Sequence, residues 1–451
     1  MTDATPALRK SLQRRHMQMI ALGGVIGAGL FVGSGVVVAS AGPAAVISFA
    51  ITGLLVVLVM RMLGEMAVAN PVVGGFYEYS RVALGELAGF LTGWMYWYFW
   101  IIVVALEAVA GARILRVWWP GIEPWQFTFA LTALFTFVNL LSVRSYGEAE
   151  FWFASIKVVA ITVFLVAGAV FVCGLWPGNA GGVVHLTAHG GFMPNGIVPV
   201  LTGAVAATGF YFGTEIVAVA AAESAEPERA VAESMQSVIW RVLVFYVGSI
   251  FLVVCIVPWN DADLMARPYV SVLQTLHIPG AATAMSLIIL TAVLSALNSG
   301  LFASSRMLMA LAVKGDAPAL FARLDRRGVP VAALLAGTAF AYVAVIMSYV
   351  SPDRVFSFLV DSYGTVAIFV YVLIAFSELK LRRRLERDSP EKLRMRMWGY
   401  PYLTRFAIAL MLLIVAAMAI IPDQRSPLIF GLVSVAVLLA AYGLRRILRR
   451  R

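Results

Sequence analysis

Long apolar runs recur along the chain, and short polar loops separate them. Each run approaches the roughly 20 residues that a helix needs to cross a bilayer. We predict twelve spans, at residues 17–40, 44–69, 88–112, 124–142, 152–174, 194–222, 241–258, 280–305, 330–349, 355–378, 401–421 and 427–445. Strands of a membrane barrel alternate in segments of about 10 residues, whereas these runs are longer and continuously apolar. The pattern therefore predicts an all-α membrane protein.

Composition and charge agree with a membrane location and add an orientation. The chain is 61% hydrophobic and 13% charged, whereas ordinary soluble domains are about half apolar and about a quarter charged. The net charge is +10, and the predicted loops on one side hold only Arg113, Arg116, Arg267, Arg354 and Arg425. Basic residues gather on cytoplasmic loops, so we expect the tails 1–16 and 446–451 in the cytoplasm. Anionic lipid headgroups explain the basic loops without a nucleic-acid partner.

The first apolar run contains "GGVIGAGLFVGSG", residues 23–35, which is unusually rich in glycine. Glycine costs about 1 kcal/mol relative to alanine inside a helix. A dinucleotide fingerprint needs the spacing G-x-G-x-x-G after a strand, which Gly27, Gly29 and Gly33 do not supply. Two interpretations remain. The glycines allow close helix packing through GxxxG pairs, or they break the helix so that its backbone N–H groups bind an anionic ligand group.

A second interrupted run favours the broken helix. The sixth run contains "GFYFGTE", where Gly209 and Gly213 precede the carboxylate of Glu215. Five helices separate the two interruptions, and an odd number of spans per half reverses the orientation of the second half. Paired interruptions of this kind mark the binding site of transporters built from inverted repeats. We therefore predict a 5+5 core with discontinuous helices 1 and 6, formed by residues 17–174 and 194–378, followed by two C-terminal helices in residues 401–445.

Several longer motifs resemble a known family. "RRHMQMIALGGVIGAGLFVGSG", "LGEMAVANPVVGGFYEYS", "SVRSYGEAEFWFASIKVVAI", "AAAESAEPERAV" and "SALNSGLFASSRMLMALAVKGDAPALF" look like bacterial amino-acid permeases of the amino acid–polyamine–organocation superfamily. The resemblance covers nearly the whole chain in order. Within the family, "LLSVRSYGE", "KGDAPA" and "FSFLVDSYG" look most like the 4-aminobutyrate (GABA) permeases.

The resemblance implies a substrate site at the two breaks. The substrate carboxylate would accept N–H groups around Ile26, Gly27, Ala28 and Gly29, at the positive end of a half-helix. Its ammonium group would meet carbonyl groups near Tyr211, Phe212, Gly213 and Thr214. An aromatic side chain at 210–212 would close over the substrate. The chain departs from the family at Gly209, where relatives often have an aromatic residue.

Ionisable side chains inside predicted spans each need a partner or a function, because one at the bilayer centre costs at least about 2.5 kcal/mol. Lys157 either extends to the cytoplasmic interface or, as the resemblance implies, occupies the place of sodium in sodium-coupled transporters of this fold. Because burial disfavours the charged form of lysine, Lys157 could lose and regain a proton during transport. Glu107 either pairs with Arg113 or, as the resemblance implies, attracts the substrate ammonium group.

Other acidic residues lie near helix ends or breaks. Glu215 follows the second break, where we expect it to support the unwound segment rather than contact the substrate. Glu65 lies four residues after Arg61, the spacing of a helical ion pair. Glu223 and Glu226 follow the sixth span in a segment that we expect to be a solvated gate.

These observations predict a secondary transporter that imports a small amino acid, GABA or a related ω-amino acid, together with a proton. A permease for proline or another neutral α-amino acid is one alternative. A membrane receptor that binds an amino acid without moving it is another, although the short tails offer no signalling domain. No catalytic or metal-binding motif occurs, so we expect no enzyme activity, no metal and no cofactor except the coupling proton. The sequence indicates no obligate protein partner.

Overall fold

The protein is described here by a computed structural model. The structure describes residues 12–448 except 24, 25, 28, 73, 178–180, 221, 222, 224–226 and 351. Its elements are all helical, and no strand occurs among them. Ala28 and Glu226, both singled out above, lie outside the described residues.

The first half of the chain begins with a short helix and a break. The elements are α1 (Arg14–Gly23), the π-helical turn η1 (Gly29–Gly33), α2 (Ser34–Ala41), η2 (Gly42–Ala44), α3 (Ala45–Ala69), α4 (Phe76–Leu84), α5 (Glu86–Trp118), α6 (Pro124–Leu141) and α7 (Val143–Val172). Gly42 and Pro43 separate α2 from α3, and Gly42 has a positive φ of 67°. This turn divides one long apolar segment into two helices.

The second half also begins with an interrupted helix. Its main elements are η3 (Val184–Leu186), α8 (Ile197–Tyr211), α9 (Ile216–Ala220), α10 (Pro227–Arg241), η5 (Val242–Gly248), α11 (Ser249–Ile256), α12 (Ala262–Ala266), α13 (Pro268–Thr275) and α14 (Ala281–Val313). After η6 (Ala319–Ala322) come α15 (Val331–Val350), α16 (Pro352–Asp388), η7 (Pro390–Lys392), α17 (Tyr402–Ile420), η8 (Pro422–Gln424) and α18 (Arg425–Leu448).

Eight helical stretches of the described residues are long and apolar enough to cross a membrane. One of them, Gly29–Ala69, runs through two predicted spans, whereas Leu243–Ile256 and Val331–Met347 are apolar but shorter. The predicted span 355–378 lies in α16, and most of its first half falls outside the described side chains. The count of twelve spans therefore stays a prediction.

α7 and α16 extend furthest beyond the ends that the apolar pattern predicts. α7 begins at Val143 rather than near residue 152, because the Ser142 hydroxyl accepts the Ser145 N–H at 3.0 Å and caps the helix. α16 continues to Asp388 through "KLRRRLERD", whose residues are mostly good helix formers despite their charge. Helix propensity and capping, which hydropathy does not measure, set both ends.

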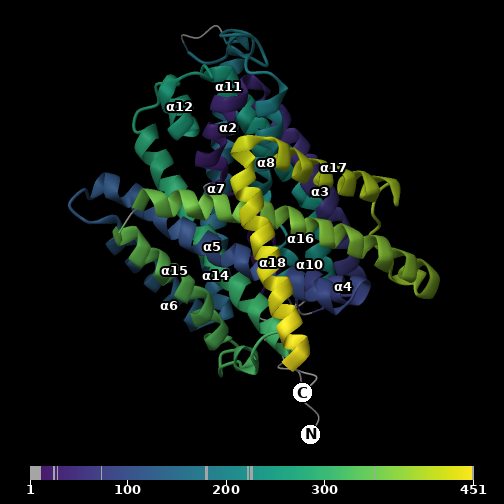
Figure 1. Ribbon diagram of the computed structural model, residues 1–451. Helices are drawn as coiled ribbons and strands as arrows, with labels where there is room; N and C mark the ends of the chain where they lie inside the picture. Colours follow the sequence, from purple (N-terminus) through teal and green to yellow (C-terminus); the bar gives the residue numbers. More distant parts are fainter. Residues whose placement is uncertain are drawn as a thin grey trace.

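The long helices α5 and α14 pack against each other at the centre of the molecule. A small residue allows the close approach, because a Cβ atom on Gly300 would lie 2.7 Å from Val104 Cγ2. α14 also contacts α7, α1 contacts α7 and α10, and α3 contacts α8. Figure 1 shows α6 and α15 together on one flank and α18, in yellow, crossing α16 on the outside. The centre therefore contains α5, α14 and the two interrupted helices.

Candidate functional site

The two helix breaks meet at a small cavity beside α5. Its volume is about 40 Å³, more than the roughly 10–15 Å³ that one water molecule needs. It is lined by Gly27, Gly29, Phe99, Trp100, Val103, Leu106, Glu107, Gly209, Phe210, Phe212 and Ala296. Of the residues predicted from sequence, Gly27, Gly29, Glu107 and Phe212 come together here. Ile26 is buried but is not among the lining residues.

The glycines at the first break have two different surroundings. A Cβ atom on Gly29 would lie 2.7 Å from Phe210 Cδ1, and one on Gly33 would lie 2.6 Å from Phe210 Cζ. These two glycines make room for the Phe210 ring. A Cβ atom on Gly27 would meet its nearest neighbour, Glu107 Oε1, at an ordinary 3.6 Å. Close packing therefore accounts for Gly29 and Gly33, whereas Gly27 faces the cavity without such a constraint.

Glu107 gives the cavity a carboxylate. It lies in the second half of α5, is only 6% exposed, and its Oε2 has no hydrogen-bond partner among the described residues. Buried polar atoms in native proteins nearly always have a partner, and an unpaired buried charge is costly. Apolar side chains of Val103, Leu106 and Phe99 line the same cavity. A cationic group of a ligand would supply the missing partner.

The second break is held by its own carboxylate. α8 ends at Tyr211, and Gly213 has a positive φ of 125°, a conformation that glycine adopts at little cost. The Glu215 carboxylate accepts the Gly213 N–H at 3.0 and 3.1 Å and the Tyr371 hydroxyl at 3.3 Å. The Thr214 hydroxyl donates to the Tyr211 carbonyl at 3.3 Å. Glu215 thus contacts the backbone of the break and does not line the cavity.

Tyr211, Gly213 and Thr214 also lie outside the cavity lining. The Tyr211 hydroxyl donates to the Phe49 carbonyl at 3.0 Å, and its ring stacks on Tyr246 at 4.1 Å. The Tyr246 hydroxyl in turn donates to the Phe210 carbonyl at 2.9 Å. Phe210 and Phe212 supply the aromatic wall on this side.

Lys157 ties three helices together next to the first break. Its Nζ donates to the Gly23 carbonyl at 2.5 Å and to Ser295 Oγ on α14 at 2.8 Å. The side chain is fully buried and does not extend to an interface. Ser295 Oγ in turn donates to Glu150 Oε1 at 2.5 Å. The Gly23 carbonyl is the last of α1, so Lys157 holds the end of that helix.

Sequence reasoning missed Glu150, which is fully buried on α7. The predicted span began at residue 152 and left it outside. The available signal was its spacing from Lys157, because seven residues are two helical turns and place both side chains on one face.

Two predicted charge assignments are wrong. Glu223 is buried, not solvated, and its carboxylate accepts Arg306 Nε at 2.8 Å. Arg306 on α14 neutralises this carboxylate and makes its burial possible. Glu65 pairs with Arg382 of α16 and accepts the Met397 N–H at 2.5 Å. Arg61 instead donates to the Arg396 carbonyl at 2.8 Å, because α16 and the following segment pack over the end of α3.

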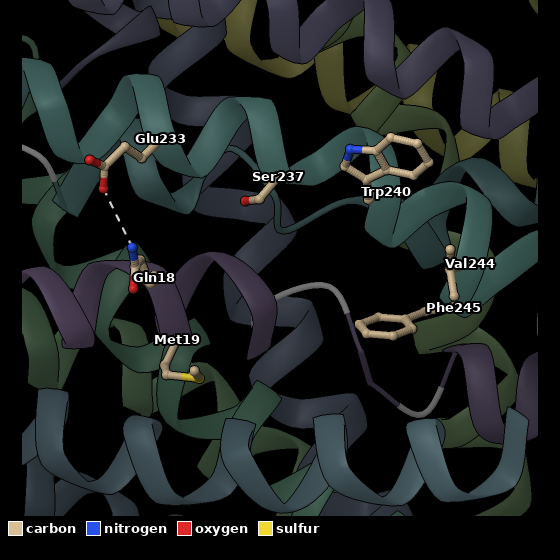
Figure 2. A pocket seen from close by; sticks show the side chains of 7 residues that line it. All are labelled: Gln18, Met19, Glu233, Ser237, Trp240, Val244 and Phe245. Atoms are coloured by element: carbon tan, nitrogen blue, oxygen red, sulfur yellow. Dashed lines mark hydrogen bonds between the residues drawn. The ribbon is translucent and has the colours of Figure 1, made fainter. Parts of the chain in front are cut away.

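A second, larger cavity of about 380 Å³ lies between α1 and the helices α10 and η5. Figure 2 shows Gln18 and Met19 facing Glu233, Ser237 and Trp240 across it. Gln18 Nε2 donates to Glu233 Oε2 at 3.4 Å. Across the part of the chain that the structure describes, no group of His, Cys, Asp and Glu side chains could hold a metal ion.

Comparisons with known proteins identify the family of the chain. The family model described as amino acid permease matches residues 16–447. The chain is 49% identical over 443 residues to a gamma-aminobutyric acid permease of Bacillus subtilis, covering 98% of this chain and 94% of that protein. It is 45% identical over 430 residues to a gamma-aminobutyric acid permease of Escherichia coli, covering 95% and 92%.

A third relative has a different substrate in its name. The aromatic amino acid transport protein AroP of Corynebacterium glutamicum is 40% identical over 423 residues, covering 93% of this chain and 91% of that protein. The helices, the family match and these near full-length relatives lead to one conclusion. The chain belongs to the amino acid permease family of the APC superfamily, as a multi-pass membrane protein that resembles the GABA permeases.

Proposed function

We propose that the protein imports GABA or a related ω-amino acid together with a proton by alternating access. The observation that carries this proposal is the central cavity, where Gly27 and Gly29 of the first break face the buried carboxylate of Glu107, whose Oε2 has no hydrogen-bond partner among the described residues. A zwitterion with an unbranched methylene chain matches these surroundings, because apolar side chains line the wall around the carboxylate. The names of the relatives support the same substrate class.

In this proposal the substrate binds across the two breaks. Its carboxylate accepts backbone N–H groups at Ile26, Gly27, Ala28 and Gly29, and its ammonium group pairs with Glu107. Carbonyl groups of Tyr211, Phe212, Gly213 and Thr214 complete the ammonium side. Because the cavity is smaller than such a substrate and Phe210 and Phe212 line it, we expect these rings to move when substrate enters. Glu215 supports the second break through Gly213.

Proton coupling is assigned to Lys157. Neutral Lys157 would keep a hydrogen bond to the Gly23 carbonyl but lose the charge that strengthens it. A change in its protonation therefore changes how firmly α1 is held beside the substrate site. This link between a proton and a helix at the site supports symport, with the proton as the only coupling ion and no cofactor.

The proposed architecture is a 5+5 inverted-repeat core of residues 17–174 and 194–378, with a further pair of helices in 401–445. The interruptions after Gly23 and after Tyr211 support it, because they fall in the first helix of each half. We place twelve spans in the bacterial inner membrane, with both termini in the cytoplasm as the basic loops indicate.

Uptake of labelled GABA into proteoliposomes under an inward proton gradient tests the function. We expect accumulation that a proton ionophore abolishes and that unlabelled GABA inhibits more strongly than proline. If proline or an aromatic amino acid inhibits uptake more strongly than GABA does, that amino acid is the better substrate and the GABA assignment is wrong. Binding without accumulation of any amino acid would indicate a receptor, and uptake insensitive to the ionophore would overturn proton coupling.

A further inference from the structure

A line of buried polar side chains runs between α7 and α14, starting at Lys157. α7 contributes Tyr146, Glu150 and Lys157, and α14 contributes Ser295, Asn298 and Ser299, all of them buried. Such residues are rare between apolar helices, because a polar group away from water needs a partner. Their spacings of three, four and seven residues place each set on one face of its helix. The two facing sets of side chains form a polar seam.

The hydrogen bonds at the start of this seam all point in one direction. Lys157 Nζ donates to Ser295 Oγ at 2.8 Å, and Ser295 Oγ donates to Glu150 Oε1 at 2.5 Å. The hydroxyl accepts from the ammonium group and donates to the carboxylate at the same time. This is the arrangement that a proton needs to pass from a donor to an acceptor through one hydroxyl group.

The second carboxylate oxygen of Glu150 is available for a further hydrogen bond. Among the described residues, neither Glu150 Oε2 nor Asn298 Nδ2 has a hydrogen-bond partner. The side chains of Ser299 and Asn298 lie near this carboxyl group. Farther along the seam, the Tyr146 hydroxyl lies 3.4 Å from Ser299 Oγ. Asn139 Nδ2 of α6 donates to Asn298 Oδ1 at 2.8 Å.

The charged and titratable neighbours of Glu150 are few among the residues that the structure describes. Lys157 and Tyr146 interact with it from α7 itself. α14 presents Ser295, Asn298 and Ser299, and α1 presents the backbone of Gly23. Arg306 and Glu223 act on Tyr146, farther along the seam. Among the described residues, the cation that acts directly on Glu150 is therefore Lys157.

The end of α1 covers Glu150. A Cβ atom on Gly23 would collide with Glu150 Oε1 and would lie 2.8 Å from Ala154 Cβ. The Gly23 carbonyl also accepts the hydrogen bond from Lys157 Nζ. Loss of charge on Lys157 therefore weakens the hold on the helix end that shields Glu150.

We propose that Glu150 is the relay that takes the coupling proton from Lys157 and releases it when α1 moves away. One N–H bond of the Lys157 ammonium breaks and its proton joins Ser295 Oγ, while the original Ser295 O–H proton forms a bond to Glu150. Lys157 keeps the electron pair as a neutral amine, and Glu150 becomes a neutral carboxylic acid. Glu150 then gives its proton to water, and Lys157 regains one from the opposite side.

This relay rests on the proton-coupled function proposed above and accounts for one proton per cycle. The transfer converts an ion pair into two neutral groups, so no isolated charge has to cross the apolar interior. A lysine without the relay would have to release its proton directly to water. The carboxylate gives the proton an intermediate position that lies beneath a movable helix.

The test compares net uptake with exchange in proteoliposomes that contain the Glu150→Gln variant. Glutamine keeps the size and an oxygen acceptor for Ser295 but cannot carry the proton. We expect proton-driven GABA uptake to fall by about a hundredfold, the lower range for loss of a positioned proton-transfer group. Exchange of internal for external GABA, which needs no proton release, is expected to continue. A merely structural role would impair both.

Controls separate failure of the relay from failure of the proposed function. Glu86→Gln changes an exposed carboxylate at the start of α5 and should leave uptake unchanged. Glu150→Asp should partly restore proton-driven uptake, and it keeps the test valid if the glutamine variant does not fold. Undiminished proton-driven uptake in Glu150→Gln would overturn the relay alone. Uptake by the unmodified protein that ignores a proton ionophore would overturn the coupling function and the relay with it.

Discussion

The two helix breaks at the centre of the molecule are stabilised by different means. The second break carries its own acceptor, because Glu215 binds the N–H of Gly213 and the hydroxyl of Tyr371. The first break, between Gly23 and Gly29, has no ionisable residue in its sequence. Among the described residues, its charged neighbours are Lys157 and Glu150 from α7 and Glu107 from α5. The carboxylate at the second break comes from the break itself, whereas the charged groups at the first break come from separate helices.

This difference indicates that the two breaks have different roles in transport. A carboxylate that satisfies the local backbone fixes the second break as a rigid part of the site. At the first break the charges belong to other helices, so we expect proton binding and substrate binding both to affect the position of α1. We therefore expect substitutions at the first break's partners to affect transport, and those at the second break to affect stability more.

Replacement of Lys157 should have the largest effect. Lys157→Met removes the donor to the Gly23 carbonyl and the proton-binding group together, while it keeps a long apolar stem. We expect gradient-driven GABA accumulation to fall by about a hundredfold or more, as for loss of a proton-transfer group. Accumulation at different external pH values measures this. Undiminished, pH-dependent accumulation would contradict the role of Lys157 and remove the main contrast between the breaks.

The sequence predicted the residues at both breaks but not all of their partners. The glycine clusters and the single carboxylate of Glu215 are local features, so a single pass along the chain finds them. Glu150 escaped because hydropathy placed the helix end after it, while the Ser142 cap extends α7. Glu223 was expected in solvent because its partner Arg306 comes 83 positions later. Contacts between distant segments depend on how helices pack, and local pattern does not encode that packing.

Substitution of Glu107 should weaken substrate binding at the first break. Glu107→Gln keeps the shape but removes the charge opposite the substrate ammonium group. A hydrogen bond to a charged group contributes about 1.5–3 kcal/mol, so we expect the apparent KM for GABA to rise by roughly 10-fold to 100-fold. Initial uptake rates over a range of GABA concentrations measure it. An unchanged KM would mean that Glu107 only stabilises the helix bundle.

Substitutions of Glu215 should lower the stability of the protein more than they weaken GABA binding. Glu215→Gln keeps an oxygen acceptor for the Gly213 N–H, whereas Glu215→Ala leaves that buried donor unsatisfied at a cost of about 1–3 kcal/mol. We expect the alanine variant to unfold at a lower temperature in detergent than the glutamine variant. Both should change the KM for GABA less than Glu107→Gln does. A larger KM effect than that of Glu107→Gln would assign Glu215 to the substrate.

Substitution of Gly33 should have the smallest effect. It tests whether the contact between Gly33 and Phe210 couples the two breaks. A Cβ atom there would lie 2.6 Å from Cζ and 2.8 Å from Cε1 of Phe210. Overpacking of this kind costs about 1–3 kcal/mol, so Gly33→Ala should lower the unfolding temperature modestly. Phe210→Leu removes the outer ring atoms and should make the alanine substitution less costly. A double-mutant cycle of unfolding temperatures measures the coupling. Additive effects would mean that the breaks adjust independently, and that the contact between Gly33 and Phe210 does not join them.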